Sequence, residues 1–319
     1  MTPTYRDPSL RDPAVLSFLY SRLWDHERVH RAASAFPTWS ALVTASIAAR
    51  WEVLGPASAS VVLPAAAPPM ATLPPDVKLI SRYSLDYPPD LLSAGTTPVV
   101  LSVRGTFPTA PAVAVGGAEN PSPQGVEIAR AAVLSAVASH TPVVLVLTDG
   151  IGAVALRTIV DAGGVGVVVV PHALTETSKY DRYLDQIVAG GGVIVSEVPP
   201  GYGTVEAFVV TAARIAAALA KAVVLAEVGR HVSSGAPLAR AAISAGRYLI
   251  VPTPQQHYVP ESALGLRVLT STRSFNADWY GTNMRIHSRV SNGLPPADAV
   301  VDTQAQMAAA ITEACAIIA

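Results

Sequence analysis

Cysteine is almost absent from this sequence, with Cys315 the only one among 319 residues. An intramolecular disulfide and a thiolate metal cluster are therefore excluded. The seven histidines are scattered, and only His26 and His30 have the i, i+4 spacing of a helical ligand pair, without the glutamate motif that accompanies such pairs. We therefore expect no metal and no other cofactor, and a cytoplasmic location.

Charge and long hydrophobic runs are also scarce. Charged residues make up 14% of the chain and the net charge is −1, which gives no electrostatic footprint for nucleic acid over the chain as a whole. The most apolar stretch, 209–227, is interrupted by Arg214 and Lys221. No run reaches the roughly 18 residues of a membrane span, and the amino terminus has no signal-peptide core. We expect a soluble protein without a membrane partner.

Apolar residues are abundant, at 50% of the chain, so a large core can be buried. From residue 110 onward, short runs of Val, Leu and Ile alternate with helical patterns, which is typical of parallel strands buried on both faces. We predict an α/β fold with a Rossmann-like, doubly wound, mostly parallel sheet. Its six strands are expected at 110–117, 142–147, 165–171, 193–197, 222–227 and 248–254.

Four regions are expected along the chain. Apolar residues at three- and four-residue intervals predict two or three short helices within 14–53, and a stretch rich in Pro, Ala and Ser predicts a linker. Segments 77–92 and 97–105 are expected to be extended, and a short strand and a helix are expected near the carboxyl terminus. The predicted regions are a helical region at 1–55, a linker at 56–75, a Rossmann domain at 76–270 and an extension at 271–319.

The first candidate site is the glycine-rich turn from Val115 to Gly125, between the first predicted strand and its helix. Gly116 and Gly117 would let a phosphate approach backbone N–H groups at a helix amino terminus. The pattern is not G-x-G-x-x-G, and no acidic residue ends the second strand, so a NAD site is disfavoured. The alternative is that the glycines only permit a tight turn.

Polar residues also follow later strands, at the carboxyl ends where parallel sheets bind ligands. Ser196 and Glu197 end one strand, and Glu197 could contact a ribose or base or act as an acid; alternatively, Ser196 only caps a helix. Arg214 lies inside a long helix and is either solvated or directed to the crevice. After the next strand come Arg230, Ser234 and Gly235, a pattern typical of a phosphate cradle.

Taken in order, these motifs resemble the DNA processing protein A family (DprA, also called Smf) from about Val77 to about Val301. The family's Y-P-x-x-L and R-G segments are similar to Tyr87–Leu91 and Arg104–Gly105. Its glycine turn resembles Val115–Gly125, and its S-E-x-P-x-G segment resembles part of Gly191–Gly201. The remaining similar segments are Arg214–Leu219, Glu227–Gly235 and Gly246–Pro252.

The sequence departs from the family at several donors. Ala118 and Glu119 stand where the glycine turn has an arginine. Gly152 and Leu156 stand where the family has an aspartate and a histidine, and the family's R-N-R triplet is reduced to Ala212-Ala213-Arg214. Because each charge-assisted hydrogen bond contributes on the order of 1.5–3 kcal/mol, we expect weaker binding of the family's usual ligand.

The resemblance implies a non-catalytic protein that binds single-stranded DNA, forms a homodimer and acts with a RecA-like recombinase in DNA uptake and recombination. The arginines that it suggests as phosphate contacts are Arg104, Arg130, Arg214, Arg230 and Arg247.

Two alternatives stay open. One is a nucleotide binder or nucleoside-phosphate hydrolase with Glu197 or Glu227 as the acid, although the P-G-G-x-G-T-x-x-E motif of such enzymes is absent. The other is a scaffold whose ligand crevice has degenerated.

Overall fold

The computed structural model describes residues 31–32, 34–55, 73–82, 84–92, 98–198, 206–227, 235–252, 299–301 and 304–317. The chain divides into two compact units. The smaller comprises Met1–Arg104, His172–Thr177 and Ser196–Gly203, and the larger comprises Gly105–Pro171, Ser178–Val195 and Thr204–Ala319. Most of the predicted linker and the predicted boundary at residue 270 lie outside the described residues, so the four predicted regions stay predictions.

The larger unit is built on a parallel sheet in the order β6-β5-β4-β3-β7-β8-β9. The chain winds outward from β3 to β6 in one direction and then returns to the other side of β3 with β7. The strands are β3 (Val113–Gly117), β4 (Val143–Val146), β5 (Gly166–Val169), β6 (Val193–Ser196), β7 (Ala222–Glu227), β8 (Tyr248–Pro252) and β9 (Ala299–Val301).

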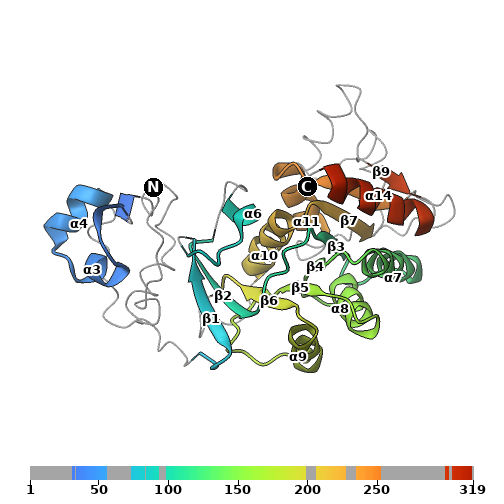
Figure 1. Ribbon diagram of the computed structural model, residues 1–319, viewed down its shortest axis with the longest axis horizontal. Helices are drawn as coiled ribbons and strands as arrows, with labels where there is room; N and C mark the ends of the chain where they lie inside the picture. Colours follow the sequence, from blue (N-terminus) through green and yellow to red (C-terminus); the bar gives the residue numbers. More distant parts are fainter. Residues whose placement is uncertain are drawn as a thin grey trace, which may run out of the picture. The chain divides into compact units, whose positions relative to one another are not determined.

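Helices cover both faces of this sheet (Figure 1). One face carries α7 (Pro123–Ala138), α8 (Ile151–Asp161), α9 (Asp181–Ala189) and α14 (Gln304–Ile317). The other carries α10 (Glu206–Leu219) and α11 (Gly235–Ser244). The predicted α/β, Rossmann-like, doubly wound fold is therefore confirmed, and each of the six predicted apolar runs forms a strand.

Burial explains why these runs are continuously apolar. Every residue of β3 and β7 is buried, because helices pack against both faces of the sheet. The longest helix of the first face, α7, begins where Ser122 caps its amino terminus and Pro123 takes the first helical position. Its buried residues Ala129, Ala132 and Val133 recur at helical spacing and pack toward the sheet.

The smaller unit holds α3 (Trp39–Thr44), α4 (Ile47–Leu54), β1 (Val77–Ser81), α6 (Pro89–Leu92) and most of β2 (Val100–Gly105). The helices α3 and α4 lie in the predicted helical region. β1 and β2 form an antiparallel pair, which agrees with the prediction of extended segments. Residues 89–92 instead form a helical turn, because Pro89 suits a first helical position. Tyr87 of the Y-P motif is buried and donates a hydrogen bond to the Pro98 carbonyl (2.6 Å), which ties the chain before α6 to the chain before β2.

Candidate functional site

The winding order of the sheet identifies where a ligand crevice should lie. β3 lies between β4 and β7, and the helices that follow β3 and β7, α7 and α11, pack on opposite faces. In open parallel sheets, such a switch point leaves a crevice at the carboxyl ends of the two strands.

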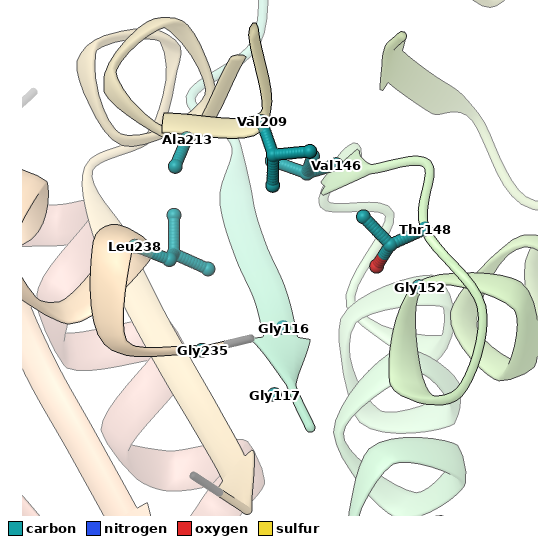
Figure 2. A pocket seen from close by; sticks show the side chains of 9 residues that line it. All are labelled: Gly116, Gly117, Val146, Thr148, Gly152, Val209, Ala213, Gly235 and Leu238. Carbon is teal, nitrogen blue, oxygen red and sulfur yellow. The ribbon is translucent and has the colours of Figure 1, made fainter. Parts of the chain in front are cut away.

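A small pocket occupies this position, and we call it the switch-point crevice (Figure 2). Its volume is about 20 Å³, close to the space that one ordered water needs. Figure 2 shows the Val209, Ala213 and Leu238 side chains facing one another above the end of β3, with the Thr148 hydroxyl as the only polar side-chain group among the lining residues. Val146 and four glycines complete the lining: Gly116, Gly117, Gly152 and Gly235.

The glycines of this crevice are needed for close packing. A Cβ at Gly116 would collide with the Leu238 side chain. A Cβ at Gly117 would lie 2.5 Å from the Glu227 carbonyl oxygen, and one at Gly235 would lie 2.9 Å from the Gly117 Cα. The structure thus brings three predicted site residues together, and the chain itself fills the space beside them. Phosphate binding at these positions stays a prediction.

The amino terminus of α7, where the glycine turn was expected to hold a phosphate, contacts a carboxylate of the protein itself. Glu227, at the end of β7, is only 3% exposed, and one of its carboxylate oxygens accepts hydrogen bonds from the Ser122 N–H (2.9 Å) and hydroxyl (2.6 Å). The Ser122 hydroxyl oxygen in turn accepts from the Gly125 N–H (3.0 Å). Burial and these contacts leave Glu227 poorly placed to act as the catalytic acid of a hydrolase.

Packing also accounts for the two departures in α8. A side chain at Gly152 would collide with the Val146 carbonyl oxygen at the end of β4, so the family's aspartate does not fit here without a shift of that strand. Leu156 is fully buried, in place of the family's histidine. At these two positions, where the family has polar side chains, this chain has a buried glycine and a buried leucine.

Ser196 and Glu197 lie at a different place on the sheet edge. Ser196 ends β6 and Glu197 follows it; β6 is three strand spacings, about 14 Å, from β3. The Ser196 side chain is buried, and its hydroxyl donates to the His172 carbonyl (2.6 Å) and accepts from the Val198 N–H (3.0 Å). Both hydrogen-bonding roles of this hydroxyl are thus used within the loop. Glu197 is half-buried and directly follows the strand.

None of the predicted arginines that the structure describes is among the residues that line the crevice. Arg214 is half-buried on α10, next to the pocket-lining Ala213. Arg247 precedes β8 at the opposite, amino-terminal edge of the sheet, where its guanidinium donates to the Ala218 carbonyl (2.8 Å) at the end of α10. Arg104 pairs with Asp76, and Arg130 pairs with Glu127 (2.8 Å). Arg230 and Ser234 lie outside the described residues.

A charged cluster that the motifs did not reveal lies at the carboxyl ends of β4 and β5. The Asp149 carboxylate accepts hydrogen bonds from the Lys179 ammonium (2.7 Å) and the Tyr180 hydroxyl (2.6 Å), and Arg157 of α8 acts on the same carboxylate electrostatically. We call these four residues the Lys179 cluster. Asp149 and Lys179 are about two-thirds exposed and Arg157 is also exposed, so the cluster faces solvent with one positive charge in excess.

The contacts of the cluster set its protonation states. The hydrogen bond from Lys179, followed by that from Tyr180, holds the pKa of Asp149 below its ordinary value. The same pairing raises the pKa of Lys179, and burial raises the pKa of Tyr180. At neutral pH the lysine is therefore an ammonium and the tyrosine a neutral phenol. None of these four residues is among the predicted site residues, and Lys179 is one of only three lysines in the chain.

Among the described residues there is neither a metal-ligand cluster nor a membrane-spanning helix. No three His, Cys, Asp or Glu side chains in this part of the chain come together to hold a metal ion. None of the helices described is long and apolar enough to cross a membrane.

The sheet order and its glycine-lined switch point are those of a Rossmann-like protein. The model of the family described as DNA recombination-mediator protein A matches residues 78–274, which is more than half of the chain. The chain therefore belongs to this family, and the resemblance to DNA processing protein A seen in the sequence is confirmed.

Two solved structures have a similar fold. The DNA processing protein A of Streptococcus pneumoniae superposes with a TM-score of 0.62 at 18% identity, over 92% of this chain and 96% of that one. The second is DNA processing protein A of Helicobacter pylori, reported for its single-stranded DNA binding mode, with a TM-score of 0.54 at 15% identity over 74% of this chain and 96% of that one. Among proteins of curated function, none matches this sequence.

Proposed function

We propose that this protein binds single-stranded DNA and holds its phosphates mainly at the Lys179 cluster. Membership of the DNA recombination-mediator protein A family and the single-stranded DNA binding of the Helicobacter pylori relative support DNA as the ligand. The phosphate contacts are assigned to this cluster because Lys179 and Arg157 form a solvent-facing pair of cations at the carboxyl edge of the sheet.

The geometry of the two cations favours a phosphate backbone as the ligand. Lys179 is hydrogen-bonded to Asp149 and lies 5.3 Å from the centroid of the Tyr180 ring, so its ammonium is held in place while its side chain is still 66% exposed. A held cation loses less conformational freedom on binding than a free one. Tyr180 is only 7% exposed, so its ring offers little surface for stacking with a base.

The switch-point crevice contributes less to this proposal. Its described lining contains no cation, and the nearest arginine along α10 is Arg214, next to Ala213. We propose Arg214 as a second contact, beside the predicted Arg230 and Ser234.

Fluorescence anisotropy with a labelled oligonucleotide, measured across a salt series, tests the proposal. We expect an affinity that falls as salt rises, because each neutralised phosphate releases counterions. No binding at low salt, or an affinity independent of salt, would contradict it. The same titration on Lys179→Ala and on Lys78→Ala, which removes an exposed lysine of β1, separates the cluster from a general loss of positive charge.

The proposal extends to a cytoplasmic, non-catalytic homodimer that acts with a RecA-like recombinase in DNA uptake and recombination, as family membership suggests. Size-exclusion chromatography with light scattering tests the dimer, and a monomer at micromolar concentration would contradict it. Capture of purified recombinase by the immobilised protein, with and without oligonucleotide, tests the partnership.

A scaffold without DNA binding is the second candidate, and it is favoured by the small, neutral crevice. It predicts a recombinase interaction or self-association with no change in oligonucleotide anisotropy at low salt.

A further inference from the structure

A buried carboxylate occupies the position where the first helix of a Rossmann-like sheet can receive an anion. The amino terminus of such a helix attracts negative charge, because its first N–H groups lack helical partners and the helix dipole is positive there. α7 is 16 residues long and starts directly after the glycine turn. The negative charge beside it comes from Glu227, at the end of the neighbouring strand β7.

Three observations show that the protein is built around this carboxylate. Glu227 is 3% exposed, so its charge has been removed from bulk water. The Ser122 N–H and hydroxyl both donate to the same carboxylate oxygen. The third helical residue is Gly125, where any Cβ would collide with that oxygen. A buried charge is tolerated only with such partners.

We propose that Glu227 is a specificity-determining residue that closes the amino terminus of α7 to phosphate by occupying it. A phosphate oxygen at this position would need the donors of Ser122 that the carboxylate already holds. It would also lie within a few ångströms of a second negative charge in a desolvated place, where repulsion is strong. A nucleic-acid phosphate would therefore bind at another part of the protein and not at the glycine turn. This inference does not depend on whether the chain binds DNA.

Thermal unfolding in inorganic phosphate tests the inference directly. The wild-type protein should unfold at the same temperature in phosphate and in chloride of equal ionic strength. Glu227→Ala frees the Ser122 donors and the space beside Gly125, so its unfolding midpoint should rise with phosphate, by roughly 4 °C for a hundredfold increase once the site begins to fill. A phosphate response in the wild type equal to that of the variant, or no response in the variant, overturns the proposal.

Glu227→Gln is the matched control, since its amide fills the same space and keeps an acceptor for Ser122. It should respond to phosphate no more than the wild type does, and a response equal to that of Glu227→Ala overturns closure by occupation. If the alanine variant does not fold, Glu227→Ser carries the same expectation as alanine, because its hydroxyl leaves most of the space open and still offers Ser122 a partner.

Discussion

Two regions at the same edge of the sheet differ in what their polar groups are used for. At the switch-point crevice, between β3 and β7, glycines let backbone and side chains of the chain approach one another, and the carboxylate that contacts the turn at Ser122 belongs to the buried Glu227. At the Lys179 cluster, beyond the ends of the adjoining strands β4 and β5, the charged groups are exposed and pair only partly with one another. The first region is closed by the protein, whereas the second faces solvent.

The difference shows that a glycine-rich turn indicates close approach without identifying what approaches. In a phosphate-binding turn, the ligand comes close to the backbone. Here Glu227 and Leu238 take that place. An exposed ion pair such as Asp149–Lys179, in contrast, contributes little to stability and keeps its cation accessible.

The largest effect on stability is expected for Gly150→Ala, which disrupts the packing of the glycine turn against α8. Gly150 precedes α8 with φ +69°, and a Cβ there would collide with the carbonyl oxygens of Ala118 and Glu119. Because these are backbone atoms of the glycine turn, the turn itself must move. We expect a loss of about 3 kcal/mol or more in the free energy of unfolding, measured by urea denaturation.

Gly163→Ala is the matched control for Gly150→Ala. Gly163 has nearly the same φ, +65°, but a Cβ there would meet nothing within 4 Å. The loss in the free energy of unfolding for Gly163→Ala should be limited to backbone strain, about 1 kcal/mol. Equal losses for the two variants would show that the turn is not tightly packed against α8.

A double-mutant cycle between Gly125 and Glu227 should give the next largest effect. In the wild type, Gly125→Ala displaces the carboxylate from Ser122 and should destabilise the protein by about 2 kcal/mol. In the Glu227→Ala background the obstacle is gone, and the same change should stabilise it by about 0.5 kcal/mol, since alanine favours the helix over glycine. Denaturant unfolding of the four proteins measures the coupling, and additive effects would contradict it.

The smallest effect concerns the pH dependence of the Lys179 cluster. The pKa of Asp149 is lowered in the folded protein, so its contribution to stability is present above its unfolded pKa and is lost as pH falls through the folded value. With Asp149 61% exposed, this contribution should stay below about 1 kcal/mol. An NMR titration of the carboxyl carbon should show the Asp149 pKa rising in Lys179→Ala and unchanged in Lys78→Ala.

The fold could be predicted from the sequence because its determinants are local. Runs such as that of β4 are continuously apolar, and helices such as α7 carry their own caps and periodic apolar residues. The ordered motifs also identified the family, although single donors such as the one at Ala118 had been lost. These features are visible without knowing which strands are neighbours.

The candidate site was harder to predict because its contacts join distant parts of the chain. Ser122 and Glu227 are separated by 105 positions in the sequence, and only the order β3-β7 brings them together. The same applies to Asp149 and Tyr180, which follow different strands and are 31 positions apart. The sequence pattern singles out Gly116 and Gly117, yet the atoms that come close to them can be named only from the structure.

The salt dependence of oligonucleotide affinity in two variants tests the contrast between the regions most directly. The double variant Lys179→Ala/Arg157→Ala removes the cations of the cluster, and Thr148→Val removes the hydroxyl of the crevice at nearly constant volume. We predict that the double variant binds more weakly, with a slope of log affinity against log salt shallower by about one, whereas Thr148→Val keeps the wild-type slope. An unchanged slope in the double variant, with a loss in Thr148→Val, would contradict the assignment of the phosphate contacts to the Lys179 cluster.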